Sequence, residues 1–136
     1  MSKTVQNPVA LLGRLLFVAL FLPAGIGKLT GFAGTVAYVA AAGLPLPTLG
    51  ALAALVVEIG GSVALLLGWG TRPAAAVLTL FTLAASVFFH PFWSVPADQA
   101  YVTQLLFFKN IAVAGGLLTL VAHGAGGWSL DARRGD

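Results

Sequence analysis

The sequence predicts an all-α integral membrane protein: a bundle of four membrane-spanning helices that forms one domain over residues 1–136. Hydrophobic residues make up 59% of the chain and charged residues 8%, whereas about one quarter of the residues in soluble domains are charged. Four apolar stretches come close to the roughly 20 residues that an α-helix needs to cross a bilayer. A sheet with open edges would leave unpaired backbone groups in lipid, so helices are the expected spans.

The four spans are expected to follow one another with short connections. They are placed at about residues 9–28, 46–68, 73–90 and 101–122, the third being the shortest. Turn residues separate them: Gly43, Pro45 and Pro47 before the second span, Gly68, Gly70 and Pro73 before the third, and Pro91 and Pro96 before the fourth. The first connection is the longest, and residues 32–42 are predicted to form a short helix at the membrane interface.

The distribution of basic residues predicts that both termini are cytoplasmic. Five of them fall on or near one side of the four-span layout, and Lys28 flanks the other: Lys3, Arg14, Arg72, Arg133 and Arg134 form the first group. The net charge of +3 is therefore attributed to topology. A cleaved signal peptide is the alternative reading of residues 1–28, but their apolar core is longer than the 7 to 15 residues typical of such signals.

Several kinds of chemistry find no support in the sequence. There are no cysteines, so thiolate catalysis and thiolate metal sites are excluded for the chain alone. The basic residues form no run, which argues against nucleic acid as a partner. His90 and His123 would lie at opposite membrane faces, so no metal site is predicted. Phosphate-binding glycine motifs, paired carboxylates and nucleophile elbows are missing. Whether the chain is an enzyme is left open.

Two opposite charges inside the spans point to a buried polar site. A charge near the bilayer centre costs roughly 2.5 to 3.5 kcal/mol, yet Glu58 lies in the second span and Lys109 in the fourth. At about 1.5 Å of rise per residue, they lie roughly 15 to 18 Å and 12 Å from the outer ends of their helices, which predicts a salt bridge between them. Lys28 and His90 at the outer ends of the other spans extend this group into a pocket that opens outward. The alternative is an ion pair that only fixes helix register.

Other polar and small residues are expected to serve packing. Thr79, Thr82, Ser86 and His90 recur at three- to four-residue spacing, so this stripe should face the bundle interior, with its hydroxyls bonded to the preceding turn. Arg14 lies about one turn inside the first span and is expected to extend its side chain to lipid phosphate. Four glycines are read as positions of close helix packing: Gly60, Gly61, Gly115 and Gly116.

The order of several short motifs resembles that of the DoxX family of small bacterial membrane proteins. These motifs are Gly13-Arg14-Leu15-Leu16, Gly25-Ile26-Gly27-Lys28-Leu29, Val57-Glu58-Ile59-Gly60-Gly61, Gly70-Thr71-Arg72, His90-Pro91-Phe92-Trp93, Phe108-Lys109-Asn110 and Trp128-Ser129-Leu130-Asp131. The resemblance covers about residues 12–131 and implies a four-helix protein of the bacterial inner (plasma) membrane. It places Arg14, Lys28, Glu58, His90, Lys109 and Asn110 on family motif positions. The family takes its name from subunits linked to quinone reduction in sulfur oxidation. The cysteine pairs of related redox-associated membrane proteins have no counterpart here.

The resulting hypothesis is a redox-associated accessory subunit that binds a quinone-like or other apolar ligand. Lys28, Lys109 and Asn110 would donate hydrogen bonds to the oxygens of the ligand, Lys109 and Asn110 being the expected cofactor-binding pair, and Glu58 and His90 would exchange protons. The expected partners are the lipid bilayer, this ligand and redox proteins, and a homo-oligomer is left open. One alternative is a structural or partner-binding subunit without a ligand. Another is a small transporter of hydrophobic compounds, which the lack of an internal repeat disfavours.

Overall fold

The computed structural model describes residues 1–135, which form six α-helices and no strand. In chain order these are α1 (Lys3–Thr30), α2 (Phe32–Ala41), α3 (Pro47–Leu67), α4 (Thr71–Phe89), α5 (Ala97–His123) and α6 (Leu130–Arg134). Four of them, α1, α3, α4 and α5, are long and apolar enough to cross a membrane. The predicted all-α architecture with four spans is confirmed, and so is the short helix between the first two spans.

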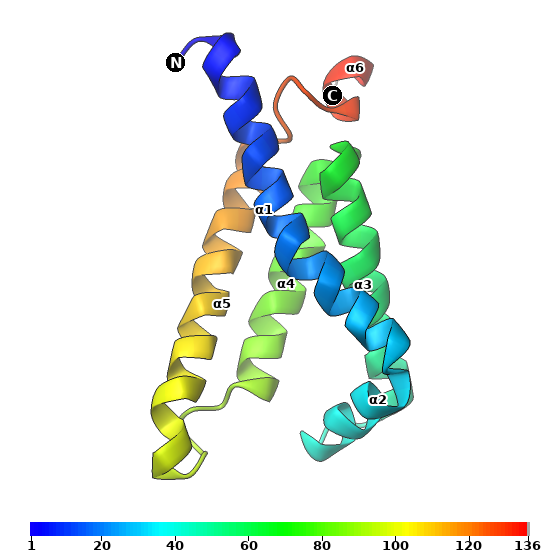
Figure 1. Cartoon of the computed structure of the whole chain (residues 1–136), viewed down its shortest axis with the longest axis vertical. Coiled ribbons are helices and arrows are strands. Elements are labelled where there is room, and N and C mark those ends of the chain that lie inside the picture. The colour runs from blue at the N-terminus through cyan, green and yellow to red at the C-terminus, as the bar shows by residue number, and fades with distance from the viewer. Residues whose placement is uncertain (136) are drawn as a thin grey trace.

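The helices are arranged as two packed pairs. Helix α1 packs against α3, α4 packs against α5, and α3 joins the pairs by packing against α4. The N-terminus, the α3–α4 turn and α6 lie together at one end, which we call the terminal end (Figure 1). Helix α2 and the α4–α5 connection lie at the opposite end, the α2 end. Toward the α2 end, α1 and α3 diverge from α4 and α5.

Proline and glycine set the helix boundaries near the predicted positions. Helix α3 begins with Pro47 in its first turn, where the missing N–H costs no hydrogen bond. It ends at Leu67, and the capping residue that follows, Gly68, has a φ of 62°, in the left-handed region that glycine adopts readily. Helices α1 and α5 begin several residues before the apolar stretches, because helical hydrogen bonding continues into polar flanking residues that a hydropathy pattern omits. Helix α6 was not predicted.

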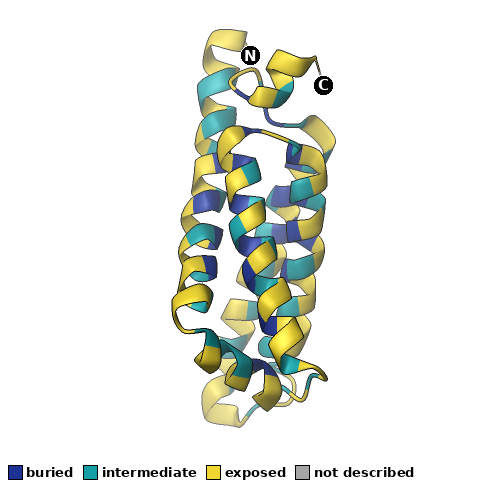
Figure 2. Ribbon diagram, turned by 90° about the vertical axis from the view of Figure 1, so that its right-hand side faces the viewer, coloured by how far each residue is buried: buried dark blue, intermediate teal, exposed yellow. Residues whose placement is uncertain are grey.

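The core is narrow, and it lies where the four long helices converge. Its buried members are Val18, Phe21, Leu65, Ala75, Leu78, Leu117 and Leu120. Most other large apolar side chains point outward, and the exposed faces of the long helices are visible in Figure 2. In a bilayer these faces contact acyl chains, so packing between helices relies on close fit. The structure gives Gly61 and Gly116 this packing role, since an added Cβ would come within 2.8 Å of Leu78 and Phe17, respectively. The same expectation is wrong for Gly60 and Gly115, which face open space.

Arg14 is fully buried, with 0% of its surface exposed. Its Nη1 donates hydrogen bonds to the carbonyl oxygens of Leu65 at 2.8 Å and Leu66 at 3.3 Å, and its Nη2 donates to that of Trp128. The last carbonyls of a helix have no partner within the helix, and a cation is stabilised beside them. The expectation that Arg14 extends to lipid phosphate is therefore wrong, because the C-terminal turn of α3 offers acceptors within reach.

The segment after α5 completes the terminal end. The carboxylate of Asp131 accepts hydrogen bonds from the backbone N–H groups of Gly70 at 2.8 Å and Thr71 at 2.9 Å, where α4 begins. The backbone N–H of Asp131 donates to the Gly68 carbonyl at 2.8 Å. Burial raises the pKa of Asp131, but the hydrogen bonds from Thr71 and Gly70 outweigh it and hold that pKa below its usual range. Arg14 and Asp131 thus join α1, the α3–α4 turn and the C-terminal segment.

Replacing Arg14 tests this arrangement. Arg14→Leu would remove three hydrogen bonds to buried or half-buried carbonyls, of which only that of Leu65 keeps another donor in the described part of the chain, the Gly68 N–H at 3.3 Å. Hydrogen bonds to charged groups contribute about 1.5 to 3 kcal/mol each. We expect a loss of at least about 3 kcal/mol in the free energy of unfolding, measured in mild detergent. Arg133→Leu, which removes an exposed charge from α6, is the control and should change stability by less than about 0.5 kcal/mol. Equal losses in the two variants would contradict the structural role of Arg14.

Candidate functional site

A pocket of about 450 Å³ lies between the helix pairs toward the α2 end. Its walls come from α1, α2, α3, α4 and the first half of α5, and its volume falls within the range of small-molecule sites. Most of the lining is apolar or aromatic and includes Leu20, Phe21, Val39, Leu44, Phe81, Phe88 and Phe89. An apolar cavity with a few polar groups is the usual form of a ligand site.

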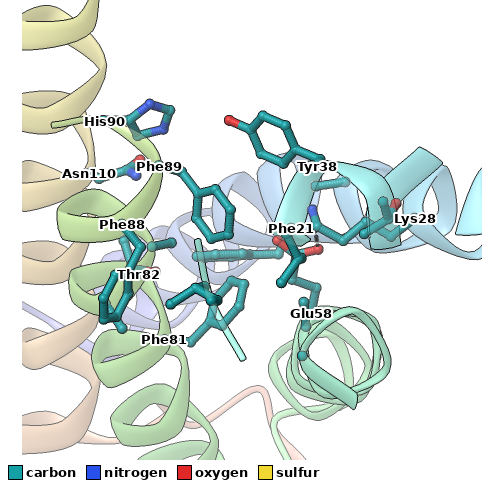
Figure 3. A pocket seen from close by; sticks show the side chains of 18 of the residues that line it. Phe21, Lys28, Tyr38, Glu58, Phe81, Thr82, Phe88, Phe89, His90 and Asn110 are labelled. Atoms are coloured by element: carbon teal, nitrogen blue, oxygen red, sulfur yellow. Dashed lines mark ion pairs between the residues drawn. The ribbon is translucent and has the colours of Figure 1, made fainter. Parts of the chain in front are cut away.

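All five predicted ligand-binding residues line this one pocket. They are Lys28 on α1, Glu58 on α3, His90 directly after α4, and Lys109 and Asn110 on α5. In Figure 3, Lys28 and Glu58 lie on one side and His90 and Asn110 on the other, with Phe89 and Tyr38 between them in this view. The structure therefore brings together residues from four separate segments of the chain. Their binding of a ligand stays a prediction.

The partner of Glu58 is Lys28. Lys28 Nζ lies 2.8 Å from Glu58 Oε2, the contact drawn as a dashed line in Figure 3. The predicted salt bridge between Glu58 and Lys109 is wrong: among residues 1–135, Lys109 has no acidic group within 4.0 Å.

Helix packing explains this difference. Gly25 lets α1 approach α3 so closely that an added Cβ would come within 3.1 Å of the Glu58 Cβ. Lys28 is three residues further along α1, on the same helical face as Gly25, and so reaches Glu58. Lys109 belongs to α5, which packs mainly against α4. Counting residues along a helix gives the depth of a side chain in the membrane but does not identify the helices that lie beside it.

The predicted polar stripe on α4 does face the interior. Thr79, Thr82 and Ser86 are all buried. The hydroxyl of Thr79 donates to the Ala75 carbonyl at 2.7 Å, and that of Ser86 donates to the Thr82 carbonyl at 2.8 Å. These contacts confirm the expected bonding to the preceding turn for two of the three hydroxyls.

Thr82 is the exception. Its side chain lines the pocket and is 3% exposed, and its Oγ1 has no hydrogen-bond partner in the described part of the chain. A buried hydroxyl without a partner costs about 1 to 3 kcal/mol, which a ligand atom could recover by bonding to it. No sequence pattern identifies Thr82 as the hydroxyl without a partner, because all three hydroxyls occupy the same face of α4.

Sequence reasoning also missed the contribution of α2. Tyr38 stacks on Phe89 of α4 with ring centroids 5.0 Å apart and an interplanar angle of 17°. Both rings line the pocket, so α2 is a wall of the site as well as a connection. No pattern within residues 32–42 identifies α4 as the surface that Tyr38 contacts. Beyond His90, the rings of Phe92, Trp93, Phe107 and Phe108 form a separate cluster with mostly edge-to-face contacts.

Comparison with known proteins identifies the family. The sequence model of the DoxX family matches residues 9–91, a range that includes Arg14, Lys28, Glu58 and His90. The chain belongs to the DoxX family. The predicted resemblance is therefore confirmed, although Lys109 and Asn110 lie outside the matched range. This DoxX chain is a multi-pass membrane protein, as its four apolar helices also indicate.

Two relatives from Escherichia coli (strain K12) match nearly the whole chain. Inner membrane protein YphA is 39% identical over 128 residues, which cover 93% of this chain and 91% of the relative. Inner membrane protein YqjF is 37% identical over 131 residues, covering 95% and 94%. The Surfeit locus protein 4 homolog of Schizosaccharomyces pombe is 36% identical over 70 residues, covering 50% of this chain but 23% of the relative. No solved structure matches the chain.

A double-mutant cycle tests the ion pair in the pocket. The pair is partly buried, so breaking it should cost less than the 3 to 5 kcal/mol typical of fully buried pairs. We expect Glu58→Gln and Lys28→Met each to lower the free energy of unfolding by about 1 to 3 kcal/mol, and the double variant to lose less than the sum.

Lys109→Met combined with Glu58→Gln is the matched control. Because Lys109 and Glu58 form no salt bridge, the losses from these two changes should add. Thermal and denaturant unfolding in detergent measure both cycles. The Lys28–Glu58 pair would be contradicted if the losses in free energy of unfolding were additive for Lys28 and Glu58 but less than additive for Lys109 and Glu58.

Proposed function

We propose that this DoxX chain is an accessory membrane subunit that binds a quinone-like or similar apolar carbonyl compound in the pocket and serves redox partner proteins. The observation that supports this proposal is the convergence of five helices on one apolar pocket whose polar residues are Lys28, Glu58, His90, Lys109 and Asn110, together with Thr35, Tyr38 and Thr82. Polar residues within spans are costly, and they are retained mainly where they bind ligands, ions or protons.

The chemistry of the pocket suits a flat apolar ring with an oxygen at each end. Lys28 and Glu58 contribute one polar wall from α1 and α3, whereas His90 and Asn110 contribute the other from the end of α4 and from α5. Lys109, next to Asn110 on α5, also lines the pocket. The ammonium of Lys109 and the amide of Asn110 donate hydrogen bonds to one ligand oxygen. Reduction of a bound quinone would take two electrons and two protons; a redox partner protein would supply the electrons, and Glu58 and His90 would exchange the protons.

A structural or partner-binding subunit is the second candidate, and one contact favours it. Lys28 and Glu58 already form an ion pair 2.8 Å apart without any ligand, so this pair can serve to hold α1 against α3. In that case the pocket would be filled by lipid, and the function would lie on the outer helix faces. A small transporter of hydrophobic compounds has less support, because the terminal end is joined by buried hydrogen bonds from Arg14.

We also propose that the protein resides in the bacterial inner membrane with both termini in the cytoplasm. The two Escherichia coli relatives are named inner membrane proteins. Basic residues gather at the terminal end, where Lys3, Arg72, Arg133 and Arg134 lie, and basic residues near the membrane favour the cytoplasmic side.

Ligand binding is tested by thermal stability with ubiquinone and menaquinone analogues. A bound ligand stabilises by mass action, with about 2.7 kcal/mol expected at a hundred times the dissociation constant. Thr82→Val and Asn110→Leu each remove a hydrogen-bonding group, so we expect the dissociation constant to rise about threefold to tenfold, corresponding to the usual 0.5 to 1.5 kcal/mol per hydrogen bond.

Thr79→Val is the matched control, because Thr79 is equally buried on the same helix but bonds to its own backbone and does not line the pocket. It should leave ligand affinity unchanged. If no quinone analogue stabilises the parent protein, the structural or partner-binding subunit becomes the favoured function. The same holds if Thr79→Val and Thr82→Val weaken binding equally.

Single cysteines test the orientation cleanly, because the chain has none of its own. Cysteines at the exposed residues Ser2 and Ala132 should be protected from a membrane-impermeant thiol reagent added to intact cells, whereas a cysteine at the exposed residue Ala97 should react. Permeabilised cells are the control and should allow labelling at Ser2 and Ala132. Labelling of Ala132 but not Ala97 in intact cells would reverse the proposed orientation.

A further inference from the structure

The charges that line the pocket do not balance. Lys28 and Lys109 are its two lysines, and Glu58 is its one acidic residue. Because Glu58 is paired with Lys28 at 2.8 Å, the charge of Lys109 is left without a counterion on the described part of the chain. Asp98 lies on the same helix, but eleven residues away, which is about 16 Å along the axis. The pocket therefore carries one uncompensated positive charge.

We propose that the ligand is a single-chain amphiphile with one negative charge, whose headgroup contacts Lys109 and Asn110 and whose apolar part lies among Phe21, Phe81 and Phe88. This inference rests on the proposed ligand-binding function and narrows the proposed apolar carbonyl compounds to those that carry a negative charge, such as a carboxylate, in place of a neutral quinone. Lys109 lines the pocket with its side chain exposed. An apolar ligand that fills the pocket would cover its ammonium, and a charge taken out of water without a partner is costly. A neutral ligand leaves that cost in place. An anionic headgroup removes it by pairing with Lys109.

The size of the pocket limits the apolar part. A volume of about 450 Å³ corresponds to about 15 water molecules at about 30 Å³ each. A non-hydrogen atom of a ligand occupies a similar or smaller volume, so one chain of about twelve carbons or one substituted ring system with a short tail fits. A phospholipid with two long chains is far larger than this space. The volume therefore favours an amphiphile with one apolar chain over a membrane lipid with two.

Three compounds with the same twelve-carbon chain separate charge from hydrophobicity. Dodecanoate is anionic, dodecanol is neutral and dodecylamine is cationic at about pH 9, where lysine side chains also stay charged. Thermal unfolding is measured in phosphatidylcholine nanodiscs over a concentration series of each compound. We expect dodecanoate to stabilise the parent protein at a concentration at least tenfold lower than dodecanol, and dodecylamine to be the weakest of the three.

Two variants of Lys109 and one remote control assign the preference to this residue. In Lys109→Gln, the stabilising concentrations of dodecanoate and dodecanol should differ by no more than about twofold, because the charge is gone. Lys109→Arg keeps the charge and should keep the preference for dodecanoate. Lys3→Gln removes the same charge at the terminal end and should leave the preference unchanged. The parent series needs no variant, so the proposal is testable even if Lys109→Gln does not fold.

Four results would overturn the inference, and they differ in what they say about the pocket. Equal stabilisation by dodecanol and dodecanoate would show that charge is not selected, and the pocket would stand as a site for neutral ligands. An anion preference that survives in Lys109→Gln would place the anion elsewhere. If phosphatidylglycerol added to the nanodiscs stabilises the protein, this effect depends on Lys109, and dodecanoate has no such effect, then the anion is a lipid headgroup instead. No stabilisation by these compounds or by quinone analogues would remove the proposed function as well.

Discussion

The guanidinium of Arg14 is the group on which the arrangement of the helices depends. The hydrocarbon region offers no water to the free carbonyls at a helix end, so each must find a donor within the protein. One buried side chain from α1 serves the last turn of α3 and the carbonyl of Trp128 together. An arginine suits this position because its planar group carries several donors in a fixed geometry, whereas a lysine ammonium is a single point of charge. The C-terminal segment is thereby held against the α3–α4 turn, where Asp131 meets the start of α4.

The two ends of the bundle consequently differ in how firmly they are joined. At the terminal end, hydrogen bonds from buried or half-buried groups link α1, α3, α4 and the C-terminal segment. At the α2 end, Tyr38 of α2 stacks on Phe89 of α4 across the gap between the two helix pairs, whereas the Lys28–Glu58 ion pair joins α1 to α3 within one pair. Regions with few buried contacts open at lower free-energy cost than the rest of a structure. The pocket lies at this less firmly joined end.

The sequence could predict the spans and the members of the site, but not the contacts within it. Hydropathy and the cost of intramembrane charge are local properties, so they identified four helices and grouped Glu58, His90 and Lys109 with Lys28 and Asn110. The pairing of Glu58 depends on which helices are neighbours, and the close approach of α1 to α3 at Gly25 decided it. The role of Arg14 was missed for the same reason, because its acceptors are backbone carbonyls 51 or more residues away. No side-chain pattern records such acceptors.

The polar residues on DoxX motif positions therefore fall into two physically different sets. Arg14 has partners for its Nη1 and Nη2 groups within the chain and no surface exposed, so its charge is already compensated by carbonyl dipoles. Lys109 is charged, lines a cavity and has no acidic partner among the described residues. Had Lys109 been the partner of Glu58, Lys28 at the helix end would have carried the spare charge close to the interface, where water compensates it at little cost. The observed pairing instead leaves the spare charge on α5, on an exposed side chain at the wall of the pocket, where a ligand can determine whether it is compensated.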